Sequence, residues 1–227
     1  MIPKIKTSLL AITIWALLAL LVLFLVPRLL NGSFPVFTVL WIAVPLVYVW
    51  RVKDTSKIGF RTVTWRLLFQ TSAINLGSLF LIMLVFEPWS HTYQRLLALV
   101  LSSPTPDTTF AWMVRFPKIP AFGAMTLYSG LVTLFGEELF FRGWLLQLLQ
   151  KRVGTLWAVA LQALLFVIPN LLVAFALPFL QGFLYAFIYT WLAIGLIGGW
   201  AASRTGSIWP SLISATICNL VLVALDF

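Results

Sequence analysis

Long apolar runs, separated by short polar stretches, make up most of the 227-residue chain. A helix needs about 20 such residues to cross roughly 30 Å of hydrocarbon, and several of the runs reach that length. None of them alternates between apolar and polar positions, as the strands of a membrane barrel do. The pattern therefore predicts an all-α fold, a polytopic transmembrane helical bundle of about seven spans. They cover residues 9–26, 36–50, 67–86, 121–149, 156–177, 179–202 and 208–225.

Two of these spans have unusual features. The run 9–26 follows two lysines as a signal peptide would, but no small-x-small cleavage site precedes Pro27, so we interpret it as a retained signal-anchor helix. The run 121–149 would reach about 43 Å as one helix, so we expect it to tilt or to project from the bilayer. Residues 87–118 are the longest polar interruption, which we interpret as an outer loop with a short interfacial helix at 96–101.

The composition agrees with a membrane solvent. The chain is 62% hydrophobic and only 9% charged, which is too apolar for the surface of a water-soluble domain. Its net charge of +9 does not indicate a nucleic-acid partner, because Lys and Arg collect in the cytoplasmic loops of membrane proteins. The basic positions that we assign to the cytoplasm are Lys4, Lys6, Arg51, Lys53, Lys57, Arg61, Arg66, Lys151, Arg152 and Arg204. This distribution predicts a cytoplasmic N-terminus, and we expect an integral protein of the bacterial inner (cytoplasmic) membrane.

Few side chains are suited to hold a metal or a cofactor. Cys218 is the single cysteine and falls in a predicted span, so neither an internal disulfide nor a Cys/His metal cluster is possible. We expect no cofactor, because the 11 Trp and 19 Phe residues are typical of interfacial belts and core packing. Gly195 and Gly199 have the small-x-x-x-small spacing, which we assign to internal helix packing rather than to a dimer face.

An acidic motif interrupts the fourth predicted span. Glu137 and Glu138 are followed by Arg142, and each charged residue at a helix centre costs about 2.5–3.5 kcal/mol on insertion scales. Glu138 and Arg142 have the i, i+4 spacing of an intrahelical ion pair. Glu137 points about 100° away and has no local partner, which makes it a candidate general base. Alternatively the acids only mark the cytoplasmic end of the span, although the apolar residues 144–146 and 148–149 continue the helix beyond them.

Three ordered motifs resemble those of a known family. The sequence Glu137-Glu138-x-x-x-Arg142, followed by Gly143, resembles the first signature of the CAAX protease and bacteriocin-processing (CPBP) family of intramembrane endopeptidases. Residues 163–170 are similar to its second motif, and residues 204–210 to the turn before its last core helix. The resemblance covers residues 130–222. It implies a four-helix CPBP-like core within residues 119–227, preceded by N-terminal transmembrane helices and an outer loop in residues 1–118.

The chain departs from the family at two histidines. Asn170 is found where the second motif ends in His, and Ala215 where the third begins with His; the single histidine of the chain is His91. In the family, a glutamate is thought to activate water with help from these histidines. The resemblance thus assigns the catalytic positions to Glu137, Glu138, Arg142, Asn170 and Asn219. An asparagine cannot transfer a proton at neutral pH. Zinc catalysis does not fit two Glu and two Asn either, so we expect no metal site.

Three functions stay open. The first is a catalytically impaired CPBP relative that acts as a scaffold, an assembly factor or a subunit of a membrane complex. Its partners would be membrane lipids and another transmembrane protein or a membrane-anchored peptide. The second is an active glutamate-dependent intramembrane endopeptidase of the CAAX type or one that processes leader peptides. The third is a small transporter or a proton-coupled channel, which the scarcity of polar residues in the other helices disfavours.

Overall fold

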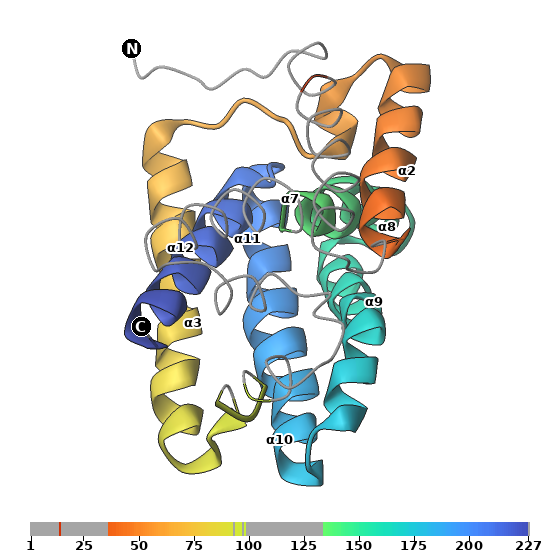
Figure 1. Cartoon of the computed structure of the whole chain (residues 1–227). Helices are drawn as coiled ribbons and strands as arrows, with labels where there is room; N and C mark the ends of the chain where they lie inside the picture. The colour runs from red at the N-terminus through yellow and green to blue at the C-terminus, as the bar shows by residue number, and fades with distance from the viewer. Residues whose placement is uncertain (1–13, 15–35, 93, 97, 99–133, 227) are drawn as a thin grey trace.

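Helices account for almost all of the computed structural model, which describes residues 14, 36–92, 94–96, 98 and 134–226. The predicted all-α fold is confirmed. The helices are α2 (Val36–Val52), η1 (Thr55–Ile58), α3 (Trp65–Ser90), α7 (Leu134–Glu137), η3 (Glu138–Leu145), α8 (Leu146–Val153), α9 (Thr155–Ala176), α10 (Phe179–Phe183), η4 (Leu184–Ile197), α11 (Gly198–Thr205) and α12 (Trp209–Asp226) (Figure 1). The element η1 is a 3₁₀-helix, and η3 and η4 are π-helices.

Within the described part of the chain, two helical segments are long and apolar enough to cross a membrane. They are α3 and the continuous segment Phe179–Thr205, which joins α10, η4 and α11. Shorter apolar helices, Val39–Val52, Thr155–Leu171 and Trp209–Cys218, occupy three other predicted spans. The predicted span 9–26 apart from residue 14, the start of the span 121–149 and most of the predicted outer loop lie outside the described residues. The number of seven spans therefore stays a prediction. The loop was expected from residue 87, but this boundary is wrong, because α3 continues to Ser90 around Pro88.

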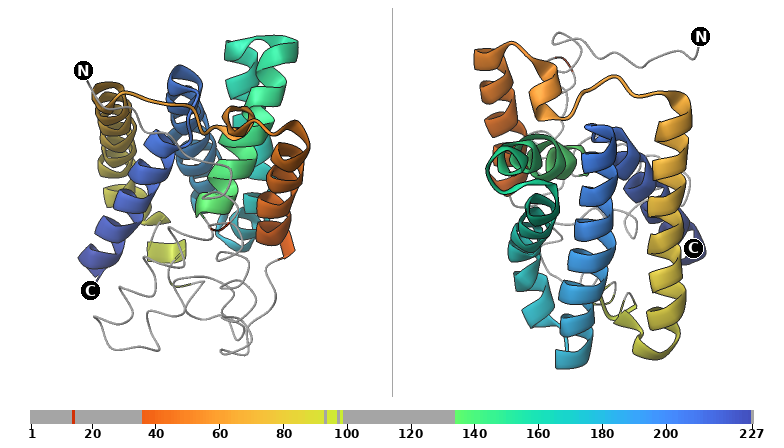
Figure 2. Two further views of the ribbon diagram at one scale, coloured as in Figure 1. Left: turned by 90° about the horizontal axis from the view of Figure 1, so that it is seen from above. Right: turned by 180° about the vertical axis from the view of Figure 1, so that it is seen from behind.

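Three long helical segments run side by side through the molecule. Segment α10–η4–α11 packs against α9 on one side and against α3 on the other (Figures 1 and 2). A short turn at Leu177 and Pro178 connects α9 to α10, so these two segments are antiparallel neighbours. Helix α12 crosses α3 obliquely and is tied to it by a hydrogen bond of 3.0 Å from Ser214 Oγ to the Ser72 carbonyl. Helices α7 and η3 lie between α2 and this bundle.

A close backbone contact locks η3 in place. Gly59 has a φ of +82° at the end of η1, and its carbonyl accepts a hydrogen bond of 3.0 Å from the amide of Ile208 at the start of α12. A Cβ atom at Gly59 would lie 2.9 Å from the Cα of Gly143, and one at Gly143 would collide with the Ile58 carbonyl. Glycine is therefore required on both sides of the junction. We call this junction of η1, η3 and the start of α12 the locked end.

The outer faces are apolar and the interior holds polar side chains. Phe69, Leu84 and Leu156 are more than two thirds exposed, at 76%, 72% and 81%. Conversely, the fully or nearly fully buried residues include Glu138, Arg142 and Gln162. Water-soluble proteins place large apolar groups inside and leave unpaired charges outside. The observed arrangement is that of a protein whose solvent is hydrocarbon.

The two glycines with small-x-x-x-small spacing both face α9. A Cβ atom at Gly195 would lie 2.9 Å from the Cβ of Ala163, and one at Gly199 would lie 2.6 Å from Oε1 of Gln162. Their absence of side chains lets η4 and α11 approach α9 closely. The interpretation of this spacing as internal packing is confirmed.

Candidate functional site

The acidic motif lies where the chain changes from α-helix to π-helix. Glu137 is the last residue of α7 and Glu138 the first of η3. Departures from the α-helical hydrogen-bond pattern are frequent at functional sites, because they turn side chains to positions that a regular helix does not offer. Here Glu138 is buried, and its neighbour Glu137 is half-buried. The two carboxylates thus have separate surroundings.

Glu138 and Arg142 form a fully buried ion pair. Glu138 Oε1 lies 3.0 Å from Arg142 Nη1, and the two side chains are 2% and 0% exposed. Ser211 of α12 donates a hydrogen bond to the other carboxylate oxygen. Arg142 Nη2 donates a hydrogen bond of 2.8 Å to the Ile194 carbonyl of η4, and its guanidinium lies 4.3 Å from the ring centre of Phe166 in α9. The predicted i, i+4 ion pair is confirmed.

This pair connects η3 to three other elements. A Cβ atom at Gly198 would lie 3.4 Å from Arg142 Nη2, so the glycine leaves the guanidinium room. Removing one partner of a buried ion pair typically costs about 3–5 kcal/mol, because the other charge is left uncompensated. The contacts of Glu138 and Arg142 are those of a structural cross-link.

Glu137 has no such partner. The structure records neither a hydrogen bond nor an ion pair between its carboxylate and any described residue, and the only described charges close to it are Glu138 and Arg142. Tyr185 of η4 lies close enough to Glu137 for its hydroxyl to interact electrostatically with the carboxylate. The carboxylate is thus free to meet a further group, which general-base chemistry or the binding of a donor would require.

Asn170 is held by the protein itself. Its Nδ2 donates a hydrogen bond of 3.0 Å to the Phe166 carbonyl one turn earlier in α9. Its Oδ1 accepts a hydrogen bond of 2.9 Å from the hydroxyl of Tyr185. Both ends of the amide therefore make hydrogen bonds within the protein, at the position that the sequence resemblance aligns with a histidine.

The comparisons with known proteins point to one family. Residues 119–221 match the family model of type II CAAX prenyl endopeptidase Rce1-like proteins. This segment is Rce1-like. The match includes all five site residues assigned from the sequence, namely Glu137, Glu138, Arg142, Asn170 and Asn219. No curated protein and no solved structure matches the chain. Together with the apolar helices, the match supports a CPBP-like membrane protein.

The third motif of the Rce1-like segment lies on α12. Ala215 is half-buried there, four residues after Ser211. Asn219 also belongs to α12, but its side chain lies outside the described part of the structure. The roles assigned to these two positions stay predictions. Among the described residues, no three His, Cys, Asp or Glu side chains are grouped as metal ligands would be.

His91 lies far from the acidic motif. It is the exposed C-cap of α3, with a φ of +51°, and its amide donates a hydrogen bond of 3.0 Å to the Glu87 carbonyl. The C-terminal end of α3 and the helix α7 lie at different levels of the bundle (Figure 1). The only histidine of the chain therefore does not replace those that the Rce1-like segment lacks.

Two residues that the sequence did not single out belong to the site. Ser211 bonds Glu138, and Tyr185 bonds Asn170. Ser211 lies four and eight residues before Ala215 and Asn219, which places all three on one helix face, so its spacing was a usable signal. Tyr185 had a weaker signal, as one of three hydroxyl side chains, with Tyr189 and Thr190, in a mostly apolar run of the sequence.

Proposed function

We propose that this Rce1-like membrane protein has lost most or all protease activity and acts by binding. In this role it is a scaffold, an assembly factor or a subunit of a larger membrane complex, and its partner is another transmembrane protein or a membrane-anchored peptide. The observation that carries the proposal is the state of Asn170. Each end of its amide makes a hydrogen bond within the protein, to Phe166 and from Tyr185, at a position where the family needs a side chain that accepts and releases protons.

The expected loss of rate is large. General acid–base catalysis contributes about 10²–10⁴ to an enzymatic rate, and an oxyanion donor contributes about 10²–10³. Asn170 does not supply the first, and Ala215 supplies neither. The remaining family groups do not compensate, because Glu138 and Arg142 neutralise each other within the bundle. The active endopeptidase stays the outcome that the experiment below is designed to detect.

The retained framework supports a binding role. The ion pair, the contact of Gly143 with η1 and the bond between Tyr185 and Asn170 all join separate helices. A chain that had lost both its chemistry and its use would not need such contacts around a motif that costs insertion energy. We assign them to keeping a binding surface in shape.

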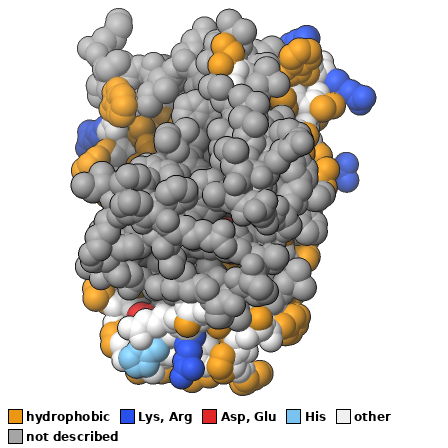
Figure 3. All heavy atoms as spheres, in the orientation of Figure 1, with side chains coloured by type: hydrophobic (Ala, Val, Ile, Leu, Met, Phe, Trp, Pro, Cys, Tyr) orange, Lys and Arg blue, Asp and Glu red, His pale blue; other side chains and the backbone are white. Residues whose placement is uncertain are grey.

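The proposal includes a membrane topology. The seven spans follow from the apolar runs of the sequence, and the cytoplasmic N-terminus follows from the positions of the basic residues. A bacterial inner membrane and a division into residues 1–118 and 119–227 are also part of the proposal. Four basic residues lie at or near helix ends: Arg51 at the end of α2, Lys57 in η1, Arg66 at the start of α3 and Arg204 at the end of α11. These ends lie at one end of the bundle, where most of the visible Lys and Arg side chains gather (Figures 1 and 3). Labelling of single cysteines added to η1 and to residue 91, in inside-out vesicles, tests the orientation.

Reintroducing the histidines tests the loss of catalysis. The wild-type chain and the double variant Asn170→His/Ala215→His are reconstituted in nanodiscs with a membrane-anchored peptide, and each is paired with a Glu137→Gln version. We expect no Glu137-dependent cleavage by the wild type and measurable Glu137-dependent cleavage by the double variant. Glu137-dependent cleavage by the wild type at the same rate as by the double variant would show that the histidines are dispensable and that the proposal is wrong.

A further inference from the structure

Glu137 differs from every other acidic side chain that the structure describes. Asp54 accepts a hydrogen bond from Ser56 and lies 3.6 Å from Lys57, and Glu138 is paired with Arg142. Glu87 accepts hydrogen bonds from the Tyr189 hydroxyl and the Gln94 amide. Glu137 alone has no partner among the described residues. A carboxylate in the membrane interior is costly unless it meets a proton or a positive charge.

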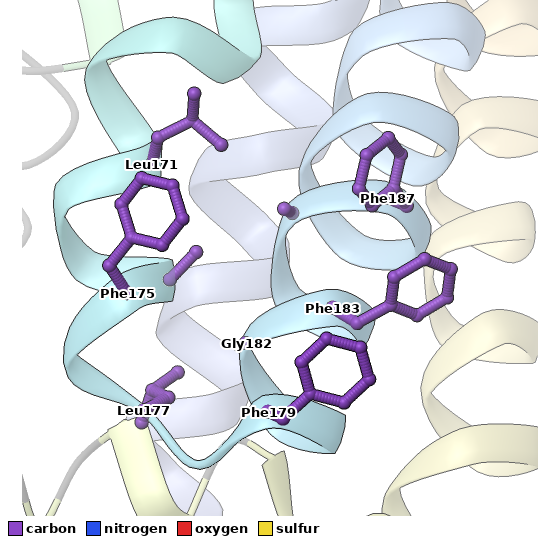
Figure 4. A pocket seen from close by; sticks show the side chains of 9 residues that line it. Leu171, Phe175, Leu177, Phe179, Gly182, Phe183 and Phe187 are labelled. Atoms are coloured by element: carbon purple, nitrogen blue, oxygen red, sulfur yellow. The ribbon is translucent and has the colours of Figure 1, made fainter.

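An apolar groove runs along α9 and α10–η4. It has a volume of about 370 Å³, and its wall includes Leu171, Ala174, Phe175, Phe179, Phe183 and Phe187. Figure 4 shows the side chains of α9 on one side and those of α10 and η4 on the other. Phe175 and Phe179 are 80% and 89% exposed, so nothing within the described part of the chain covers them. The groove is an apolar surface open to the surroundings of the protein.

The groove ends at the polar site. Asn170 lies one turn before Ala174 on α9, and Tyr185 directly precedes Ala186, which also lines the groove. The hydrogen bond between Asn170 and Tyr185 therefore bridges the same two helices at the end of the groove. Tyr185 is in turn within range of the Glu137 charge. The groove is thus apolar near the turn at Leu177 and polar at its other end, where Tyr185 also interacts with the charge of Glu137.

We propose that this groove binds a transmembrane helix of a partner protein, whose single Lys or Arg side chain pairs with Glu137. This inference rests on the proposed binding function and names the partner's chemistry. The apolar face of such a helix matches the exposed phenylalanines, and its basic group matches the unpaired carboxylate. The ion pair forms where water is scarce. The apolar contact alone does not select among apolar helices, so the ion pair adds selectivity for a helix that carries a basic residue.

Other occupants match only half of this surface. A lipid acyl chain fills the groove but leaves Glu137 uncompensated. A second copy of this chain offers no suitable cation from its described helices, because Arg142 is already paired and the remaining basic residues lie at or beyond helix ends. A basic transmembrane helix satisfies both the groove and the charge.

The test is a binding titration with designed peptides in nanodiscs. The full-length protein carries a fluorescent donor, and an apolar peptide of about 20 residues carries the acceptor. One Arg is placed at successive positions over one helical turn, because the depth of Glu137 has to be matched, and a peptide with Leu at all positions is the reference. We expect one Arg position to bind about tenfold more tightly than the Leu peptide. Equal affinity at every position would overturn the proposal.

Three variants show whether Glu137 causes the preference for Arg and whether the groove phenylalanines cause the apolar binding. Glu137→Gln should remove the preference for Arg, while binding of the Leu peptide stays as it was. Phe175→Ala combined with Phe179→Ala should weaken the binding of both peptides, and both side chains are exposed enough to be shortened without unfolding. Phe69→Ala on α3, where the side chain is 76% exposed, is the matched control and should change neither affinity. An Arg preference that survives Glu137→Gln, or groove variants that behave like Phe69→Ala, would contradict the proposal.

The same samples separate this inference from the proposed function. Mass spectrometry of the peptide after the titration shows whether it has been cut. Binding with the Arg preference and an intact peptide agrees with both proposals. Binding with the Arg preference and Glu137-dependent cleavage supports the basic partner but refutes the loss of catalysis. An intact peptide without the preference refutes the basic partner alone.

Discussion

At the locked end, η1, η3 and the start of α12 are packed in close backbone contact. The groove between α9 and α10–η4, in contrast, is open and lined by exposed phenylalanines. The locked end contains Gly59 and Gly143, which have no room for a Cβ atom, and the neighbouring Arg142, which is fully buried. The groove has Phe179 at 89% exposure. Glu138 belongs to the first region and is neutralised by Arg142, whereas Glu137 has no partner among the described residues. The two glutamates thus separate a role in holding the bundle together from a role in meeting another molecule.

The largest effect is expected from breaking the buried ion pair. Arg142→Ala leaves Glu138 charged and buried, which should lower the free energy of unfolding by about 3–5 kcal/mol. Replacing both residues, as Glu138→Leu with Arg142→Met, should recover most of that loss, because apolar groups of similar size tolerate the same interior. Unfolding in mixed micelles by a denaturing detergent measures both. A double variant as unstable as Arg142→Ala would mean that the charges are not the reason for the loss.

Glycine substitutions compare the locked end with a free helix surface. An alanine at Gly143 would collide with the Ile58 carbonyl, and we expect a loss of about 1–3 kcal/mol as for other overpacked sites. Gly77 in α3 has no atom within 4 Å of a Cβ position, so alanine there should be neutral or stabilise by about 0.5–1 kcal/mol. The same unfolding assay tests the pair. Equal effects of both substitutions would contradict the close contact between η1 and η3.

A smaller effect is expected at the polar end of the groove. Tyr185→Phe removes the hydrogen bond to Asn170 Oδ1, and interhelical hydrogen bonds in membranes are worth about 0.6 kcal/mol on average. The change should loosen the contact between α9 and η4 and leave the locked end intact. Hydrogen exchange of the backbone amides in α9 and in η3 shows separately whether the α9–η4 contact and the locked end have loosened. Faster exchange in η3 as well would show that the two regions are not independent.

The smallest effect is expected at Asp54, on the exposed turn outside the spans. Its hydrogen bonds from the Ser56 hydroxyl and amide hold the pKa of the carboxyl below its usual value of 3.8. The ionised form is therefore favoured by folding, so its contribution is present above pH 3.8 and is lost as the pH falls through the lower folded pKa. Because the group is largely exposed, Asp54→Ala should cost only about 0.5 kcal/mol. A stability difference between wild type and variant that does not shrink at low pH would contradict this assignment.

The sequence was a good guide to whatever depends on local pattern. Runs of apolar residues predicted the positions of α3 and of the segment Phe179–Thr205, and the i, i+4 spacing predicted the ion pair of Glu138 with Arg142. Both depend only on residues that lie close together in the sequence. The family motifs likewise lie in one continuous part of the chain.

The remaining features depend on contacts between distant parts of the chain. The π-helical geometry of η3 is not encoded in a simple period, and Ser211 reaches Glu138 only because α12 folds back onto η3. Tyr185 and Asn170 meet because the turn at Leu177 makes their helices antiparallel. The groove could not be predicted for the same reason, since it is formed by two faces that are each merely apolar in the sequence.

The most direct test of the loss of catalysis is a long incubation of the wild-type protein in nanodiscs with membrane-anchored peptides. Mass spectrometry compares the products with those of Glu137→Gln under the same conditions. The account predicts identical, intact peptides in both samples, because Asn170 and Ala215 supply no proton transfer beside Glu137. Cleavage by the wild type that disappears in Glu137→Gln would show that the site is an active endopeptidase, and the account would be wrong.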